Sequence, residues 1–159
     1  MKVLIRILKK LLLLDSINLV GRYQPDKTMK VPVIKSLGYD NFFEPEPWLV
    51  SLLRKILGSA SSHDYFIDVG VNVGQTLLKV KSVNRSISYF GFEPNPNCLF
   101  YLYELLRVND FQNVTIFPFA LSESSGVIDL NLYSTNATDS TASIVQGFRS
   151  KSTGKIKVP

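Results

Sequence analysis

The sequence is poor in the residues that cross-link a small protein or bind metals. Its 159 residues include one cysteine, Cys98, and one histidine, His63. A lone cysteine forms no intrachain disulfide, and with a single histidine it cannot complete a four-ligand zinc site of the usual kind. We therefore expect no metal site. Cys98 lies in an apolar run and is predicted to be a small buried side chain, whereas His63 lies in a polar loop and is predicted to be exposed.

A long uninterrupted apolar run is also missing. Residues 2–14 form the most apolar stretch, but four cations interrupt it at helical spacing, whereas a transmembrane helix needs about 20 apolar residues. The stretch has no small-residue cleavage site of the kind that a signal peptide carries. A single cysteine is compatible with a reducing compartment, so we expect a cytoplasmic location.

Residues 1–20 are predicted to form a basic amphipathic helix. Two interpretations of this helix stay open. It either packs on the domain with its lysines in water, or lies on an anionic membrane through residues 2–14 as a peripheral contact.

Charge is unevenly distributed along a chain of globular composition. Hydrophobic residues make up 45% and charged residues 19% of the sequence, enough for one domain with a core. Residues 1–35 hold eight Lys or Arg and two Asp, a sum of +6, and residues 149–159 form a basic tail of +4. Residues 36–148 sum to −5. The acidic central part argues against a nucleic-acid groove, so we expect no nucleic-acid partner.

Residues 21–63 are interpreted as a linker followed by an accessory helix. The linker is rich in proline and glycine and contains one predicted strand at 30–34. The helix begins at Pro47 and ends before Gly58, since proline suits a first turn and glycine the position after a last turn. Its predicted buried face consists of six apolar residues: Trp48, Leu49, Leu52, Leu53, Ile56 and Leu57.

From residue 64 the pattern alternates between strands and helices. Apolar runs predict strands at 65–69, 87–92 and 114–119, and helical periodicity predicts helices at 75–83 and from the cap Asn95 to about 107. Pro118 cannot donate to a central ladder, so the third strand should lie at an edge. The fold class is therefore α/β and Rossmann-like, with a partial parallel sheet covered on both faces. A half-exposed strand is predicted at 126–133, before a polar loop.

A glycine turn follows the first strand and carries the main functional signal. Asp68, Gly70, Asn72 and Gly74 give the pattern D-x-G-x-N-x-G, which fails the glycine spacing of the NAD fingerprint. Asn is the best substitute for glycine where the backbone turns left-handed. The amides of the turn, and the helix that starts at Gln75, suit the carboxylate end of a cofactor.

A lone glutamate ends the second strand, 23 residues after Gly70. Glu93 is placed to bind two ribose hydroxyls, and Asp68 suits an ammonium group. A tight connection or a helix-capping aspartate is the plainer interpretation of each feature alone. The joint spacing favours a nucleotide-type cofactor at the carboxyl ends of two adjacent strands.

These residues resemble the FkbM-type S-adenosylmethionine-dependent methyltransferases. The resemblance covers roughly residues 64–148. It rests on the glycine turn, on Glu93-Pro94-Asn95-Pro96, and on Ala120-Leu121-Ser122 with Gly126.

The resemblance implies a class I methyltransferase fold with S-adenosyl-L-methionine as methyl donor. It also implies O-methylation of a sugar or small-molecule hydroxyl, so the expected partner is a small-molecule or glycan acceptor. The implied cofactor contacts are Asp68, Gly70, Asn72, Gly74, Gln75, Glu93 and Pro94, with Ala120 and Leu121 near the adenine.

The sequence departs from the family after residue 148. Family members continue with a strand that reads roughly Ile-Lys-Ile-Asp-Val-Glu-Gly, which is absent here, so we expect these residues to form the N-terminal half of such a domain. A catalytically incomplete fragment or a non-catalytic binding module is therefore one alternative function, and a peripheral membrane protein is another. No catalytic residue is assigned, and the loop residue Asp139 is interpreted as a solvated acid.

Overall fold

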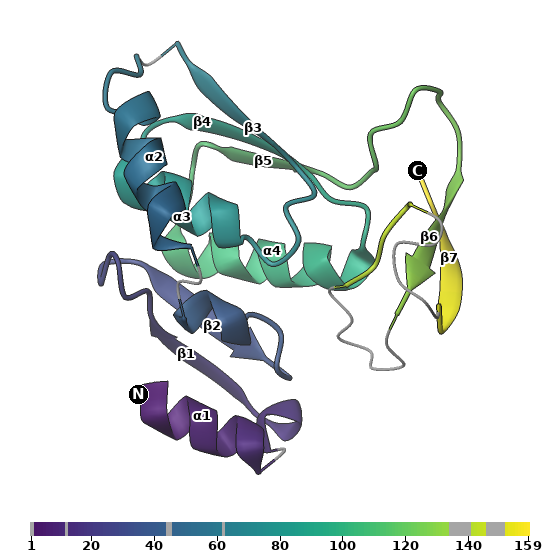
Figure 1. Cartoon of the computed structure of the whole chain (residues 1–159), viewed down its shortest axis with the longest axis horizontal. Coiled ribbons are helices and arrows are strands. Elements are labelled where there is room, and N and C mark those ends of the chain that lie inside the picture. Colours follow the sequence, from purple (N-terminus) through teal and green to yellow (C-terminus); the bar gives the residue numbers. More distant parts are fainter. Residues whose placement is uncertain (1, 12, 44–45, 62, 134–140, 146–151) are drawn as a thin grey trace.

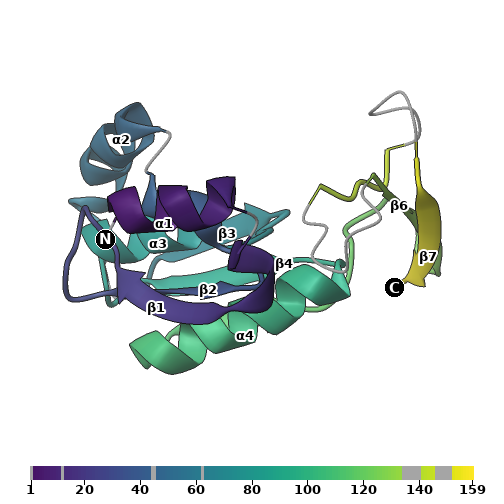
Figure 2. The same cartoon turned by 90° about the horizontal axis from the view of Figure 1, so that it is seen from below.

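The computed structural model describes residues 2–11, 13–43, 46–61, 63–133, 141–145 and 152–159. Its elements are stacked in layers, with a parallel sheet at the top of Figure 1, helices below it, then a two-stranded hairpin, and the first helix outermost. Figure 2 shows the same order from below. The elements are α1 (Lys2–Lys10), η1 (Leu13–Ser16), β1 (Asn18–Arg22), β2 (Lys30–Ile34), η2 (Tyr39–Phe42), α2 (Pro47–Leu57), β3 (Tyr65–Val69), α3 (Gln75–Val83), β4 (Ser88–Phe92), α4 (Pro96–Asn109), β5 (Val114–Phe117), β6 (Ile128–Leu132) and β7 (Gly154–Val158).

Three parallel strands form the sheet that carries the predicted site. Their order is β3-β4-β5, which confirms the three predicted strands and the edge position of the third. Val69 pairs with Phe92 and Phe92 with Phe117, so the carboxyl ends of all three strands meet at one edge. The chain therefore has a mixed α/β fold with a parallel sheet flanked by helices, compatible with a Rossmann-like arrangement.

The two crossover helices form where the sequence predicts them. The side chain of Asn95 caps α4 by accepting a hydrogen bond from the Asn97 backbone N–H at 3.0 Å. Asp110 ends α4 in a left-handed conformation, two residues later than predicted. Leu102 and Leu105 are fully buried. Periodicity and caps agree here, which is why these boundaries are predictable.

The predicted face of α2 is partly wrong. Trp48, Leu52 and Ile56 are 62%, 43% and 57% exposed, whereas Val50, Leu53 and Leu57 are buried. The helix is apolar around most of its circumference, so periodicity alone does not choose the buried side. Its start at Pro47 and its end before Gly58 are as predicted.

The predicted N-terminal helix is much shorter than residues 1–20. It ends at Lys10, and residues 18–22 form β1, which pairs antiparallel with β2. Residues 21–34 therefore hold the end of β1, the turn and β2 of a hairpin and are not an irregular linker, and the predicted strand at 30–34 is confirmed. The hairpin lies against α4, where the Tyr101 hydroxyl donates to the Pro32 carbonyl at 2.9 Å. Within the described ranges, none of the helices has the length and apolarity needed to cross a membrane.

The predicted basic tail includes a strand. Residues 154–158 form β7, which pairs antiparallel with β6. The Asp129 carboxylate lies between two lysines, with Oδ1 2.8 Å from Lys157 Nζ and Oδ2 3.7 Å from Lys155 Nζ. These exposed ion pairs contribute little free energy, so backbone pairing and the burial of Leu130 and Val158 hold the hairpin together.

Lys81 is buried between α3 and the strands that follow it. Its side-chain amine donates to the carbonyl oxygens of Ile87 at 2.6 Å, Asn113 at 3.2 Å and Arg85 at 3.3 Å. Burial lowers the pKa of Lys81 to about 8, and the nearby charge of Arg85 acts in the same direction. The amine thus joins three backbone segments at the amino-terminal end of the sheet.

One face of the sheet is open in the described part of the chain, contrary to the predicted covering of both faces. Tyr65, Ile67 and Val69 on β3 are 62%, 54% and 63% exposed, while α3 and α4 lie below the sheet in Figure 1. Among the described strands, β4 alone pairs with β3, so the other edge of β3 is unpaired. Aromatic side chains continue this face, with the rings of Phe92 and Phe117 stacked at 4.9 Å.

Candidate functional site

The glycine turn after β3 has the backbone shape that the sequence indicates. Gly70, Asn72 and Gly74 all have positive φ, at 84°, 53° and 73°. The left-handed conformation of Asn72 confirms the prediction that asparagine replaces a glycine there. The N–H groups of Gly70 and Val71 both donate to the Phe92 carbonyl, at 2.9 and 3.2 Å, which binds the turn to the end of β4.

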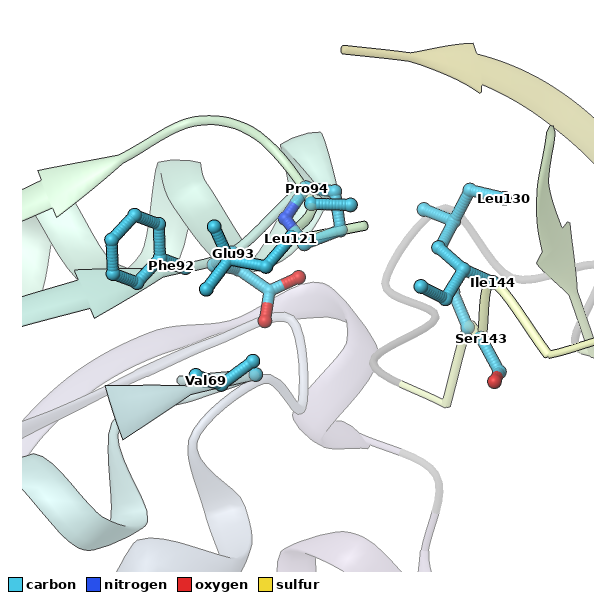
Figure 3. Close-up of a pocket in the computed structure, with 11 residues that line it drawn as sticks. Val69, Phe92, Glu93, Pro94, Leu121, Leu130, Ser143 and Ile144 are labelled. Atoms are coloured by element: carbon cyan, nitrogen blue, oxygen red, sulfur yellow. The ribbon is translucent and has the colours of Figure 1, made fainter. Parts of the chain in front are cut away.

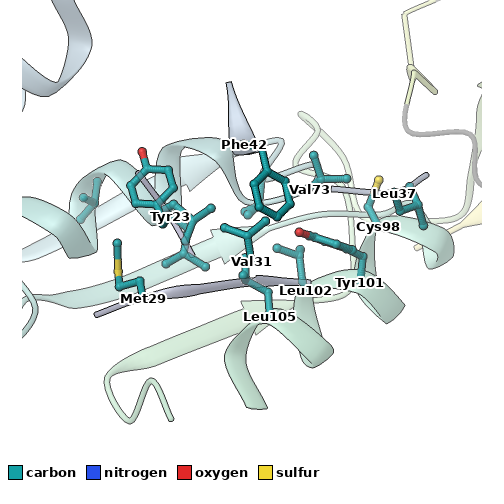
Figure 4. Packing of buried hydrophobic residues seen from close by; sticks show 14 of the residues in the cluster. Tyr23, Met29, Val31, Leu37, Phe42, Val73, Cys98, Tyr101, Leu102 and Leu105 are labelled. Atoms are coloured by element: carbon teal, nitrogen blue, oxygen red, sulfur yellow. The ribbon is translucent and has the colours of Figure 1, made fainter. Parts of the chain in front are cut away.

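The buried core supports this turn from beneath. Val73 is buried in the turn and belongs to the same core cluster as Tyr101, Leu102 and Leu105 of α4 (Figure 4). The Cys98 thiol donates to the Asn72 side-chain oxygen at 3.7 Å, and Cys98 is buried as predicted. The side of the turn at Gly70 is different, since a Cβ atom placed there would meet nothing within 4 Å. A ligand therefore has access to the backbone at Gly70 and not at Gly74.

Glu93 lies at the carboxyl end of β4, and its side chain links the turn after β3 to the turn after β4. Its side chain is 6% exposed. The Asn72 N–H donates to Oε2 at 2.7 Å, and the Asn95 N–H donates to Oε1 at 2.8 Å. Burial raises the pKa of Glu93, the two backbone N–H groups oppose this, and the charge of Asp68 raises it further. Each carboxylate oxygen keeps a lone pair for another hydrogen-bond donor.

Asp68 is half-buried on the helix-covered face of β3. Its carboxylate accepts a hydrogen bond from the Tyr89 hydroxyl on β4. Burial raises the pKa of Asp68, and the Tyr89 hydrogen bond lowers it. Burial and the neighbouring carboxylate also raise the pKa of Tyr89, so its hydroxyl stays protonated and donates. Sequence reasoning placed Asp68 at the site but missed its partner Tyr89.

A cavity of about 210 Å³ opens at the carboxyl ends of β3 and β4 (Figure 3). Five of the nine predicted cofactor residues line it: Gly70, Glu93, Pro94, Ala120 and Leu121. The other four, Asp68, Asn72, Gly74 and Gln75, lie outside its lining. In Figure 3 the Glu93 carboxylate lies between Val69 and the Leu121 side of the cavity.

Comparisons with known proteins found no match. No family model, no curated protein and no solved structure matches the chain. The chemistry of this site therefore has to be argued from its own described residues. The Glu93 carboxylate lies beside exposed backbone at Gly70, and apolar side chains such as Leu121 and Leu130 line the same cavity, an arrangement that suits a ligand with hydroxyl donors at one end and an apolar ring at the other.

The far wall of the cavity was missed by sequence reasoning. Leu130 on β6 and residues 142–144 close the side opposite Glu93. Backbone hydrogen bonds in both directions between Asn131 and Ser143, at 2.9 and 3.0 Å, hold this segment against β6. The alternation in 126–133 could have indicated Leu130 as a buried position, but no pattern in the polar loop indicates Ser143 or Ile144.

Two other expectations concern residues away from the cavity. His63 is exposed, as predicted. Asp139 lies outside the described residues. Within the ranges that the structure describes, no three His, Cys, Asp or Glu residues gather as a metal site would require.

A first test concerns Gly74, the buried glycine at the end of the turn. A Cβ at Gly74 would lie 2.7 Å from Leu105 Cδ2, at a φ of +73°. Replacing Gly74 with alanine should therefore lower the free energy of unfolding by roughly 2–4 kcal/mol, from strain and overpacking together. Gly154→Ala is the matched control, since a Cβ at Gly154 would meet nothing within 4 Å. Urea denaturation measures both variants, and equal stability of the two would contradict the packing described here.

A second test concerns the pair of Asp68 and Tyr89. Tyr89→Phe removes the hydroxyl that opposes the effect of burial, so the pKa of Asp68 should rise further above the value of an exposed aspartate. Since the folded pKa then lies further above the unfolded one, the variant should lose more stability at neutral pH than at about pH 4. Carboxyl-carbon NMR titration and urea denaturation at both pH values give the measurement. The exposed Tyr103, replaced by phenylalanine, should change neither quantity.

Proposed function

We propose that the chain is an S-adenosyl-L-methionine-binding methyltransferase domain of the class I fold, similar to the FkbM type, that acts on a hydroxyl of a sugar or small molecule. One observation carries the proposal. The buried Glu93 carboxylate lies directly beside a turn with three left-handed residues, at the shared carboxyl edge of β3 and β4. Binding of nucleotide-type cofactors at this edge is the general behaviour of open parallel sheets.

The described residues fit such a cofactor at three points. Glu93 has a free lone pair on each oxygen for the two ribose hydroxyls. Gly70 leaves open space at the backbone for the methionine end, and Ala120 and Leu121 give an apolar wall for the adenine. Asp68, outside the cavity lining, would attract the ammonium group through its charge. When bound, S-adenosylmethionine supplies a methyl group on a sulfonium, and these residues orient it.

A second candidate function is binding without turnover, by a catalytically incomplete or non-catalytic module. Two observations favour it. The cavity of about 210 Å³ is smaller than the roughly 300–1,000 Å³ of most ligand sites. The neighbouring edge of β3 is also unpaired in the described part of the chain. Methyl transfer depends on holding the acceptor in line with the methyl donor, and no described residue is assigned to that task.

Titration calorimetry with S-adenosylmethionine tests the cofactor site. The unsubstituted chain should bind it, and Glu93→Gln should weaken binding by about 10- to 100-fold, the effect of losing hydrogen bonds to a charged acceptor. Glu104→Gln is the matched control, because Glu104 is a partly exposed acid on α4, away from the cavity, whose carboxylate pairs with Arg107 at 2.8 Å. Gly70→Ala adds a methyl group at the open side of the turn and should weaken binding as well; because its φ of +84° strains an alanine, thermal unfolding of this variant is measured beside its affinity.

The outcomes separate the two candidate functions. No binding heat for the unsubstituted chain, or equal affinity of the Glu93 and Glu104 variants, would contradict the proposed site. Binding without transfer of labelled methyl to a panel of sugar acceptors would support the second candidate.

The pH dependence of binding gives an independent test. Ribose hydroxyls donate to the ionised form of Glu93, whose pKa is raised in the free protein. Ligand binding should therefore release a proton, and affinity should increase with pH through the raised pKa and become constant above it. Calorimetry in two buffers of different ionisation enthalpy measures the released proton. Glu93→Gln should abolish this part of the dependence, and a residual slope would report Asp68.

A further inference from the structure

Among its described side chains, the N-terminal helix α1 contacts the domain along one side. Ile5 is 1% exposed, and Leu8 packs against the core. Arg6 lies 4.8 Å from the ring centroid of Phe43, and Lys9 lies 3.7 Å from that of Tyr39. These contacts fix the rotation of the helix about its axis and thereby decide which residues face outward.

The outward side carries an exposed apolar stripe. Val3, Ile7 and Leu11 follow one another at a spacing of four residues and are 68%, 49% and 62% exposed. The Leu11 N–H donates to the Ile7 carbonyl at 3.0 Å, so the helical turn includes Leu11. Leu13, which follows closely, is 47% exposed. In Figures 1 and 2, α1 is the outermost layer on its side of the molecule, so the stripe is accessible to a large flat partner.

Cations border this stripe. Arg6, Lys9 and Lys10 are exposed and form no ion pair with any acid in the described part of the chain. On the helical wheel Arg6 and Lys10 fall next to Ile7 and Leu11, and each cation lies within one helical turn of the stripe. The rings of Phe43 and Tyr39 beneath Arg6 and Lys9 do not neutralise their charge. Residues 1–35 sum to +6.

We infer that α1 is a docking surface for an anionic lipid bilayer. An apolar stripe beside a row of cations is what an interfacial helix needs, since the apolar side chains enter the acyl boundary while the cations meet anionic headgroups. At nine residues, α1 is far shorter than the roughly 20 residues that span a bilayer, so it lies in the plane of the surface. The two interpretations left open by the sequence are therefore compatible: one side of the helix packs on the domain and another side faces the membrane.

The exposed stripe of α2 is the natural comparison. Trp48, Leu52 and Ile56 have the same spacing, and Arg54 and Lys55 lie beside them. The charge differs, because residues 36–64 hold two Lys or Arg and four Asp or Glu, a sum of −2. Charge complementarity to anionic lipid therefore selects α1 and not α2.

Flotation with vesicles tests this surface on the full chain. Vesicles of equimolar phosphatidylcholine and phosphatidylglycerol should carry the protein upward in a density gradient, vesicles of phosphatidylcholine alone should not, and added salt should release the protein. Replacing both Ile7 and Leu11 with glutamine should lower the bound fraction by roughly tenfold. Lys10→Glu reverses one exposed charge and keeps the ring contacts of Arg6 and Lys9; it should lower the bound fraction similarly and weaken the salt dependence.

The matched control replaces both Leu52 and Ile56 with glutamine. This variant should float like the unsubstituted chain. Circular dichroism and thermal unfolding should be unchanged in all three variants, since every replaced side chain is exposed. Should the Ile7 and Leu11 variant unfold, the charge variant decides alone.

Three results would overturn the inference. They are no flotation of the unsubstituted chain, flotation that survives both the Ile7 and Leu11 substitution and Lys10→Glu, or loss of flotation in the α2 variant and not in the α1 variants. Binding of the α1 cations to duplex DNA with no flotation would assign the helix to a different polyanion and reject the membrane. The inference does not depend on the cofactor site, so failure of either leaves the other standing.

Discussion

The described site depends on the two hydrogen bonds that the Glu93 carboxylate accepts from the backbone. The carboxylate accepts one backbone N–H from the turn after β3 and one from the turn after β4. Those hydrogen bonds hold two loops, each belonging to a different strand, in one fixed relation. A buried carboxylate without a positive partner is costly, and its raised pKa reflects that cost. The fold tolerates the buried carboxylate because each of its oxygens accepts one backbone N–H. Each oxygen also keeps a lone pair that a ligand can use.

The parallel pairing of β3 and β4 places the turns that follow these two strands close enough for Glu93 to hydrogen-bond both. Asp68 pairs with Gly91 and Val69 with Phe92, so the residues after each strand emerge side by side. Gly91 has a further role, because a Cβ there would come within 2.5 Å of Val71 Cγ2. The absence of a side chain at Gly91 lets the turn residue Val71 lie over β4, which brings Asn72 within reach of Glu93.

Sequence reasoning succeeded where local patterns act alone. The bounds of α3 and the start of α4 follow from periodicity and from the cap Asn95, and the left-handed Asn72 follows from residue chemistry, whereas α4 ends two residues later than predicted. It failed where a distant segment decides. β1 was assigned to a helix because the leucine run of residues 11–14 continues the apolar character of α1. The residues of β7 looked like a basic tail because their strand character depends on pairing with β6. Likewise, α2 is apolar nearly all round, so only its tertiary neighbours choose its buried side. The same holds for the site. Strand spacing predicts Glu93, whereas Ser143 and Ile144 of the opposite wall are held by the backbone bridge between Asn131 and Ser143, which no local pattern indicates.

The buried Lys81 has a consequence for following motions of the domain. Its amine holds three carbonyl oxygens and is shielded from solvent, yet it gives up its proton more readily than an ordinary lysine. In the closed state an acylating reagent cannot reach this amine, and once the segment opens the effect of burial is lost and the amine reacts like that of an ordinary exposed lysine. The rate at which Lys81 is acylated at mildly alkaline pH therefore measures how often the connection between α3 and β4 opens. Acylation of Lys81, measured by mass spectrometry, therefore reports local unfolding without any added labelling site.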